Sequence, residues 1–420
     1  MWGVILFRQI QGNARTCVLA EPLFVVPASL YTTYASVYML HLHVTDTQIG
    51  LITTLNLLLQ IISAFISGHL TDRLGRRKAL WVFDLLSWSL GALLWAVAQN
   101  FWWFVIAAMF NSLQRIPTTA WYCLLVEDTA AEKRRHVFTG LQIVSVLGGL
   151  FAPIGGVLVA HFTLVPAVRI MYVFFFISVT IMIYVRHRGM HETEIGLRKM
   201  KETGKANFGA DFKHYLITLK QIFRNRTLLL LFFVYVLWNF QVTISNTFVP
   251  VYQVEFLHIP AVMISLFPAI SSAAIVVMLL TVVPRFREEQ AKTLMNIGFL
   301  FLIAANVLLI VIPAQNFALV VVSTVLAAVG TIISNPYLES VVANAIDDEH
   351  RSTMLSVLNV LILVFASPAG IIGGWTYSID AHIPIGLIIA AFVVSIVFVR
   401  LAKRRSDLDM RMETTANLDV

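Results

Sequence analysis

Apolar stretches recur along the whole chain, and short polar segments separate them. Each stretch is about 20 residues long, which is enough for a helix to cross a bilayer. A chain in lipid must satisfy its own backbone hydrogen bonds, so we predict that every stretch forms a transmembrane helix. The pattern predicts twelve spans, at about 22–43, 47–70, 79–99, 102–125, 136–160, 165–185, 228–256, 260–284, 293–313, 317–343, 352–377 and 383–402.

The composition agrees with this pattern. Of the 420 residues, 58% are hydrophobic and 13% are charged, and the mean hydropathy is +0.81. A soluble domain carries about 25% charged residues. We therefore predict an all-α integral membrane protein.

The basic residues indicate the orientation of the spans. Of the 30 Lys and Arg residues, 28 fall on one side of the predicted membrane, either between the spans or at their ends, and the exceptions are Arg115 and Arg169. Positive charge marks cytoplasmic segments, so both termini are expected in the cytoplasm and the spans in an inner or plasma membrane. The net charge of +7 follows from this bias. It does not indicate nucleic-acid binding, because the bases are spread over many segments instead of one face.

The chain contains two similar halves. One segment ends with "GGLFAPIGG" at Gly156 and another with "SPAGIIGG" at Gly374, and both run from a charged turn through an apolar helix to Pro and Gly-Gly. A tandem repeat of this kind is typical of transporters, whose site lies between the halves. We predict six-helix bundles at 1–185 and 227–402, a cytoplasmic linker at 186–226 and a tail at 403–420. The linker is predicted to hold an amphipathic helix with an apolar face at Phe212, Tyr215, Leu216, Leu219, Ile222 and Phe223.

Between the second and third spans lies the stretch "GHLTDRLGRRK". It resembles the loop signature of the major facilitator superfamily, G-x-L-x-D-R-x-G-R-R-K. The resemblance implies twelve transmembrane helices in two pseudo-symmetric six-helix bundles, with the first, fourth, seventh and tenth helices around a central cavity. Every specified position matches: Gly68, Leu70, Asp72, Arg73, Gly75, Arg76, Arg77 and Lys78.

We predict that this loop forms a polar latch on the cytoplasmic side. Gly68 would let the second helix pack closely on the eleventh, as in the family. Asp72 can face the positive end of a helix dipole and pair with Arg73 or Arg76. Gly75 permits a tight turn. The alternative is that the basic residues only set the topology.

Charged residues inside spans are costly and are therefore candidate functional residues. Arg115 lies near the middle of the fourth span, where it could bind an anionic group or tune a nearby acid. A buried pair with Asp84 is its structural alternative. Glu339 in the tenth span is the first candidate proton carrier and Asp84 the second. For Glu339, a salt bridge at an inner gate is as well supported as the role of proton carrier. For Asp84 and Glu21, a structural role near the membrane surface is preferred.

Aromatic and polar side chains follow the faces predicted to line the cavity. Such a surface suits a small organic solute with apolar surface and a few hydrogen-bonding groups. Lipid-facing aromatic residues are the alternative. The predicted cavity residues are Tyr31, Tyr34, Tyr38, Asn111, Arg115, Thr118, Tyr122, Tyr235, Trp238, Asn239, Asn246 and Asn335.

The sequence predicts a secondary active transporter and not an enzyme, since no catalytic cluster or nucleotide motif lies in the spans. We expect a monomer without cofactor or metal that moves a small molecule across the lipid bilayer by alternating access, with protons as the coupling ion. Export of amphipathic compounds is slightly preferred, because "GGLFAPIGG" matches in part the G-x-x-x-G-P-x-x-G-G motif of the family's drug antiporters. Uptake of a sugar, nucleoside or organic anion stays open, as does a non-transporting membrane sensor on the same fold.

Overall fold

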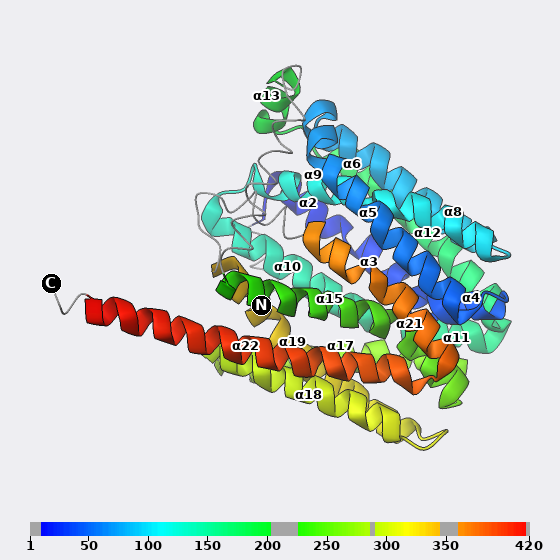
Figure 1. The fold of residues 1–420 in the computed structure, drawn as a ribbon. Helices are drawn as coiled ribbons and strands as arrows, with labels where there is room; N and C mark the ends of the chain where they lie inside the picture. Colours follow the sequence, from blue (N-terminus) through cyan, green and yellow to red (C-terminus); the bar gives the residue numbers. More distant parts are fainter. Residues whose placement is uncertain (1–9, 203–225, 286–289, 345–359, 417–420) are drawn as a thin grey trace.

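The computed structural model describes residues 10–202, 226–285, 290–344 and 360–416. Every regular element in this part of the chain is a helix, and long helices run side by side through the molecule (Figure 1). Among the described residues, ten helical segments are long and apolar enough to cross a membrane, and helix α17, Leu266–Thr281, is a shorter apolar helix. The predicted all-α membrane fold is confirmed.

Several spans of the N-terminal half consist of consecutive helical segments. The short elements η1 and η3 are 3₁₀ turns, and η2 is a turn of π-helix. The helices of this half are α2 (Gly12–Ala20), α3 (Pro22–Tyr31), η1 (Thr32–Tyr34), α4 (Ala35–His41), α5 (Asp46–Leu74), α6 (Arg76–Asp84), η2 (Leu85–Leu90), α7 (Gly91–Val97), α8 (Phe101–Asn111), η3 (Ser112–Gln114), α9 (Arg115–Val126), α10 (Ala131–Gly149), α11 (Pro153–Phe162), α12 (Leu164–Gly189) and α13 (Glu194–Glu202).

The C-terminal half is built in the same way. A second π-helical turn, η5, continues its first long helix. The helices of this half are α15 (Arg226–Val251), η5 (Tyr252–Phe256), α16 (Ala261–Ile264), α17 (Leu266–Thr281), η6 (Val283–Arg285), α18 (Ala291–Val311), α19 (Phe317–Asn344), α21 (Pro368–Ile379) and α22 (His382–Ala416).

The first and sixth spans extend past their predicted boundaries. The first helical segment begins at Gly12 and not at about 22, and α12 continues to Gly189, past the predicted end at 185. The two extensions support each other, because the side-chain amide of Asn13 donates to the carbonyl oxygen of His191 and accepts from its nitrogen, both at 3.0 Å. Hydropathy does not detect such polar turns. The amphipathic helix predicted at 212–223 lies outside the described residues.

Polar residues at the start of α5 fix where this helix begins. The side chain of Thr45 accepts from the nitrogen of Gln48, and the Gln48 side chain accepts from the nitrogen of Thr45 at 3.0 Å. This reciprocal capping box satisfies two N–H groups that a helix start leaves unpaired. The long second span therefore begins at Asp46, as the sequence pattern indicates.

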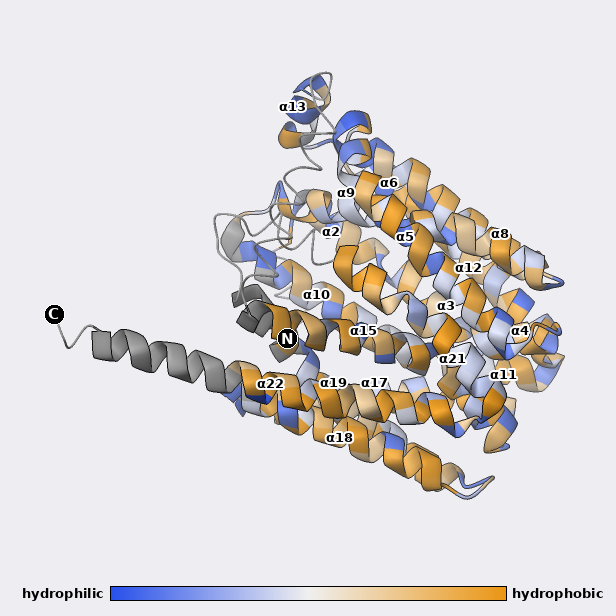
Figure 2. Ribbon diagram, viewed as in Figure 1, coloured by the Kyte–Doolittle hydropathy of each residue, from blue (hydrophilic) through white to orange (hydrophobic). Residues whose placement is uncertain are grey.

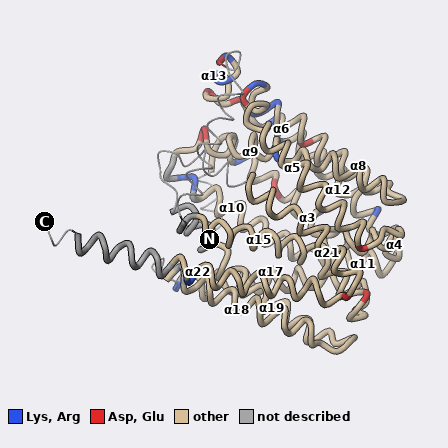
Figure 3. The backbone as a smooth tube through the Cα atoms, viewed as in Figure 1, with Lys and Arg blue, Asp and Glu red and all other residues tan. Residues whose placement is uncertain are grey.

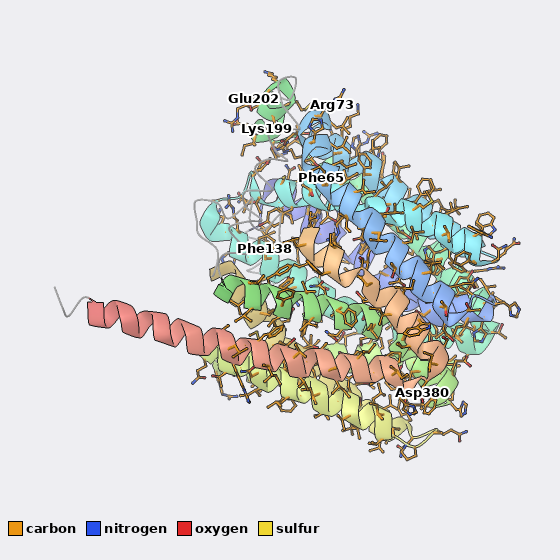
Figure 4. All side chains as sticks on the ribbon, in the orientation of Figure 1. Phe65, Arg73, Phe138, Lys199, Glu202 and Asp380 are labelled. Carbon is orange, nitrogen blue, oxygen red and sulfur yellow. The ribbon has the colours of Figure 1, made fainter. Side chains whose placement is uncertain are left out.

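The two ends of the bundle differ in charge. Orange, hydrophobic residues cover the lengths of the long helices (Figure 2). Lys and Arg gather mainly at the end that carries α13 (Figure 3). Arg73, Lys199 and Glu202 lie at this end, and Asp380 lies at the opposite end (Figure 4). We call the two ends the linker end and the Asp380 end.

The two halves contact each other through three sets of helices. Helix α5 packs on α21, α4 on α15, and α10 and α11 on α16 and α17. A Cβ on Gly50 would lie 2.3 Å from the carbonyl oxygen of Gly370, and one on Gly156 would lie 2.4 Å from that of Val262. Glycine allows this close approach of backbones. These contacts lie toward the Asp380 end, so the halves are closed against each other there.

Thr54 fastens α5 to α21 one turn further along. Its hydroxyl donates to the carbonyl oxygen of Ser367 and accepts from the nitrogen of Ile371, both at 2.8 Å. These are the two groups that an α-helix would pair directly. The Thr54 hydroxyl is thus inserted into the first turn of α21, where such an insertion is a recognised cause of a helix kink.

Candidate functional site

A tight turn joins α5 to α6 at Gly75. Its φ is +83°, in the region that favours glycine. A Cβ at this position would lie 2.6 Å from Oε2 of Glu192 and 2.8 Å from the sulfur of Met200. Any other residue would be strained and would displace the segment that follows α12. The tight turn predicted at Gly75 is confirmed.

Arg76, the first residue of α6, is buried beneath this turn. Its guanidinium donates to Oδ1 of Asp72 at 2.7 Å and to Oε1 of Glu127 at 3.2 and 3.3 Å. The other oxygen of Glu127 accepts from the hydroxyl of Thr193. Hydrogen bonds between charged groups are among the strongest in proteins. The predicted pairing of Asp72 with Arg76 is confirmed, whereas Arg73 is exposed.

Glu192 contacts the start of α6 from the other side. Its carboxylate accepts from the backbone nitrogen of Arg76 at 3.1 Å and from that of Arg77 at 3.0 Å. Helix N-termini leave N–H groups unpaired and attract negative charge. Arg77 also donates to the carbonyl oxygen of His187, at 3.0 Å through Nε and at 2.5 Å through Nη2. The loop is therefore bound to the end of α12 and to the segment that follows it, a contact that the motif alone does not indicate.

Gly68 differs from its neighbours in the motif, because it has open space around it. Nothing lies within 4 Å of a Cβ built at this position. The close approach of α5 to α21 takes place at Gly50 and Gly370 instead. The predicted contact of Gly68 with the eleventh helix is not made in this conformation, since the halves approach each other at the opposite end.

Two adjoining cavities lie inside the bundle. The first, of about 310 Å³, is enclosed mainly by the N-terminal half, and the second, of about 690 Å³, lies between the halves. Thr32 and Asn246 line both. Residues of α3, α8, α15 and α19 contribute, and these helices belong to the first, fourth, seventh and tenth predicted spans. These are the helices that the family resemblance places around the cavity.

Aromatic rings and amides line the first cavity. The ring centroids of Tyr31 and Tyr172 are 4.3 Å apart, and those of Trp95 and Tyr172 are 5.2 Å apart with the planes at 23°. Asn56 and Gln114 add amide groups to the wall. All the described residues that line either cavity are uncharged. The walls can therefore offer stacking and neutral hydrogen bonds to a solute.

Asn111 is held in one orientation at the wall of the first cavity. Its Oδ1 accepts from Nε1 of Trp95 at 3.1 Å, and its Nδ2 donates to the carbonyl oxygen of Ser87 at 2.7 Å. A Cβ on Gly91 would lie 2.3 Å from this Nδ2, so the amide fits between the helices because glycine stands there. Asn111 thus connects the cavity to the π-helical turn η2.

Arg115 does not line either cavity. Its Nε donates to Oε1 of Gln60 at 2.7 Å, and Nε2 of Gln60 donates to Oδ1 of Asn56 at 2.6 Å. Asn56 lines the first cavity, so Arg115 is connected to it through two amides. The alternative pair of Arg115 with Asp84 is wrong, because Asp84 faces Nη1 of Arg186 at 4.0 Å.

The three tyrosines that share a face of the first span are divided between cavity and core. Tyr31 lines the first cavity, whereas Tyr34 and Tyr38 are fully buried and line neither. The Tyr38 hydroxyl donates to the carbonyl oxygen of Trp95 at 3.1 Å and lies 3.4 Å from Nε of Arg169. The structure corrects the prediction for Tyr34 and Tyr38, since the closed Asp380 end covers this part of the face.

The seventh span lines the cavities with partly different residues from those predicted. Trp238 and Asn246 line the second cavity. Asn239 donates instead to the carbonyl oxygen of Tyr235 at 2.9 Å, on its own helix, and neither residue lines a described cavity.

The remaining predicted residues lie on α9 and α19. Thr118 and Tyr122 are exposed on α9, and the Thr118 hydroxyl donates to the carbonyl oxygen of Gln114 at 2.6 Å. Asn335 is half-buried on α19. The helix continues past Glu339, but the side chain of Glu339 lies outside the described residues. Its predicted role therefore stays a prediction.

The helical bundle, the loop motif and the cavities between two halves define a multi-pass membrane transporter fold and not an enzyme. The sequence matches the model of the Major Facilitator Superfamily over residues 23–289, and the chain belongs to this family. No curated protein matches the chain.

Solved structures of transporters share the fold. The nucleoside transporter NupG is 15% identical and has a TM-score of 0.70, over 94% of this chain and 99% of that one. The peptide transporter POT in complex with sulfate is 13% identical, with a TM-score of 0.68 over 93% and 94% of the two chains. A bacterial homologue of the human lysosomal transporter Spinster, in an inward-facing and occupied conformation, is 14% identical, with a TM-score of 0.67 over 93% and 96%.

Proposed function

We propose that the protein is a secondary active transporter that moves an uncharged organic solute by alternating access. The observation that carries this proposal is the pair of adjoining cavities, one of them between the halves, with uncharged aromatic, amide and hydroxyl groups on the described walls. A site between two halves can open to each side in turn as the halves rock. The proposal includes the twelve spans and the two six-helix bundles predicted from the sequence.

The chemistry of the walls supports a solute with a flat or apolar face and several hydrogen-bonding groups. Aromatic rings such as Tyr172 offer stacking, and amides such as Asn56 and Gln241 offer donors and acceptors. An ionised group would lose its hydration there without a paired charge, which costs several kcal/mol. Arg115, the candidate partner of an anion, is engaged with Gln60. Nucleosides and neutral amphipathic compounds therefore rank before organic anions, in agreement with the likeness to NupG.

The charge distribution supports an inward-facing conformation. Basic residues gather at the linker end (Figure 3), and by the positive-inside rule this end faces the cytoplasm, with both termini on that side of the cell membrane. The halves meet closely at the Asp380 end through Gly50 and Gly370. The site would then be closed to the outside.

Protons are the proposed coupling ion, and a monomer is the proposed working unit. The membrane potential supplies about 2.3 kcal/mol per charge per 100 mV, enough to concentrate a solute substantially. The sequence offers Glu339 and Asp84 as proton carriers. Export of amphipathic compounds remains the prediction for the direction of transport, and uptake remains its alternative.

A thermal-shift screen of the purified protein tests the solute class. The panel contains nucleosides, neutral sugars, neutral amphipathic compounds and organic anions. We expect the midpoint of unfolding to rise with one or more uncharged solutes, because a ligand that binds only the folded state stabilises it. Stabilisation by organic anions alone would overturn the proposed solute class.

Proteoliposomes loaded with the best solute distinguish a transporter from a sensor. With a pH gradient imposed, we expect the solute to become concentrated on one side and the gradient of solute to collapse when a protonophore is added. The side on which it accumulates gives the direction. Binding without any movement of solute would support a sensor and overturn the transporter proposal.

A further inference from the structure

Three charged side chains meet inside the N-terminal half, away from both cavities. Nη2 of Arg186 donates to Oε2 of Glu21 at 2.5 Å, and Nη1 of Arg186 lies 4.0 Å from Oδ2 of Asp84. The exposed fraction of the side chain is 7% for Arg186, 18% for Glu21 and 6% for Asp84. Arg186 lies on α12, Glu21 lies between α2 and α3, and Asp84 is the last residue of α6. We call these three residues the buried triad.

The buried triad has one acid more than it has bases. The other titratable group that faces it is Cys17 on α2, whose thiol is directed at the sulfur of Met190 at 3.4 Å. Among the described residues, neither Oδ2 of Asp84 nor Nε of Arg186 has a hydrogen-bond partner. A buried carboxylate that has an oxygen without a hydrogen bond is costly when it is ionised. One proton on the two carboxylates would make the buried triad neutral.

The π-helical turn η2 begins directly after Asp84. Such turns are rare and often occur at functional sites. Toward α12, the hydroxyl of Ser89 lies 2.6 Å from that of Thr180, within hydrogen-bond distance. Toward α8, the carbonyl oxygen of Ser87 accepts from Nδ2 of Asn111, which lines the first cavity. A movement of Asp84 would therefore reach the cavity wall through a single π-helical turn.

Aromatic side chains separate the buried triad from the cavities. The ring centroid of Phe24 lies 4.8 Å from that of Trp88 and 5.3 Å from that of Phe175. Phe24 lines the second cavity, and the other two line the first. A solute in either cavity therefore meets rings and not the charges. This arrangement keeps proton binding and solute binding at separate places joined by η2.

We propose that the buried triad is a proton-binding site that couples transport to the proton gradient, with Asp84 as the carboxylate that gains and loses the proton. Arg186 would compensate the negative charge of Asp84, and Glu21 would hold the Arg186 side chain in position. An ionised Asp84 is attracted to Arg186, and a protonated one is released from it. The irregular backbone of η2 gives room for this change, and Asn111 transmits it to the first cavity. The coupling part rests on the proposed function, whereas proton binding itself does not.

Infrared difference spectroscopy of the purified protein tests proton binding without any solute. A protonated carboxyl group has a carbonyl stretching band that disappears when the group is ionised and shifts in heavy water. We expect a pH-dependent band of this kind in the wild type and its loss in Asp84→Asn. Asp380→Asn is the matched control, because its side chain is 55% exposed at the opposite end of the bundle, and it should keep the band. A band that is unchanged in Asp84→Asn would overturn the proposal, and loss in Glu21→Gln alone would overturn the choice of Asp84.

The folded state of the variants can be checked separately. Asp84→Asn leaves the contact between Arg186 and Glu21 in place, so we expect it to fold. Arg186→Lys keeps the charge but loses the guanidinium geometry, and it should shift the pH at which the band disappears. If Asp84→Asn cannot be purified, the result for Arg186→Lys decides, and an unshifted band would overturn the proposal.

Proteoliposomes test the coupling. With the solute from the thermal-shift screen, Asp84→Asn should lose accumulation driven by a pH gradient, while the solute still raises its midpoint of unfolding. Accumulation at the wild-type level would overturn the coupling role. If the wild type moves no solute, the proposed transport function fails, and the infrared result still decides whether the buried triad binds a proton.

Discussion

The carboxylate of Glu192 caps helix α6 by accepting hydrogen bonds from the backbone nitrogens of Arg76 and Arg77, at 3.1 and 3.0 Å. Glu192 belongs to the segment that follows the sixth span, whereas Arg76 and Arg77 belong to the loop between the second and third spans. The predicted latch is therefore held from two directions, by Asp72 within its own loop and by Glu192 from outside it. The residues that directly follow α12 and the loop therefore form one structural unit.

Glu192→Ala should lower the free energy of unfolding by about 1–2 kcal/mol, because two N–H groups at the start of α6 lose their acceptor. Thermal unfolding of the detergent-solubilised protein measures the change. Glu194→Ala is the matched control, since Glu194 is exposed in the first turn of α13. An equal loss in both variants would show that the cap is unimportant.

Gly75→Ala and Gly68→Ala should differ in their effects, although both lie in the same motif. Gly75 has φ +83° and ψ 152°, a region that costs other residues about 1–3 kcal/mol. Gly75→Ala should therefore lower the midpoint of thermal unfolding, whereas Gly68→Ala should not, because nothing lies within 4 Å of the added Cβ. If Gly68 meets the eleventh helix when the latch closes, Gly68→Ala should still slow transport. A stable Gly68→Ala with a wild-type transport rate would contradict the predicted contact.

Gly50→Val should favour conformations in which the Asp380 end is open, because the new side chain would overlap the backbone at Gly370. Each 1.4 kcal/mol of destabilisation of the closed end changes the equilibrium about tenfold. In a background without native cysteines, a cysteine at Asn246 reports the change as faster labelling by a membrane-impermeant thiol reagent from outside. Gly386→Val is the control, since nothing lies within 4 Å of a Cβ there. Equal labelling rates in the two variants would argue against closure at this interface.

Asn111→Ala should weaken solute binding by roughly tenfold, because it leaves Nε1 of Trp95 and the carbonyl oxygen of Ser87 without their partner at the cavity wall. Titration of the solute by calorimetry measures the affinity. Asn100→Ala is a control on the same helix, since Asn100 only caps the start of α8 through the nitrogen of Trp102. It should reduce stability without changing affinity. If Asn100→Ala weakened solute binding and Asn111→Ala did not, Asn111 would not belong to the binding site.

Glu339→Gln distinguishes the two candidate proton carriers. If the buried triad carries the proton, Glu339→Gln should retain accumulation driven by a pH gradient, and Asp84→Asn should lose it. Uptake and export assays in the same proteoliposomes measure both. If only Glu339→Gln lost accumulation, Glu339 in the tenth span would be the proton carrier.

Features set by local geometry could be predicted from the sequence. Gly75, Asp72 and Arg76 lie within one turn of each other, so their spacing indicates both the tight turn and the ion pair, and the structure has both. The contribution of Glu192 could not be predicted in this way. It is far from the loop in sequence, and an acid in a polar linker carries no pattern that indicates its partner.

Helical periodicity identifies a face of a helix but not what covers that face. Tyr31, Tyr34 and Tyr38 share a face by their spacing, yet only Tyr31 lines a cavity. The closed Asp380 end buries the other two. Hydropathy also does not predict that Arg186 is buried, because the apolar stretch ends before it. Two acids inside spans, Glu21 and Asp84, were the available signal that a buried base was needed.

The insertion of the Thr54 hydroxyl between Ser367 and Ile371 gives the interface a pivot. At about 1.5 Å per residue, α5 extends about 12 Å from Thr54 to its start at Asp46 and about 30 Å to its end at Leu74. The two arms of this lever are unequal. A rotation about Thr54 that separates the halves slightly at the Asp380 end would therefore move the linker end more than twice as far. The charged loop at the end of α5 would make the larger movement.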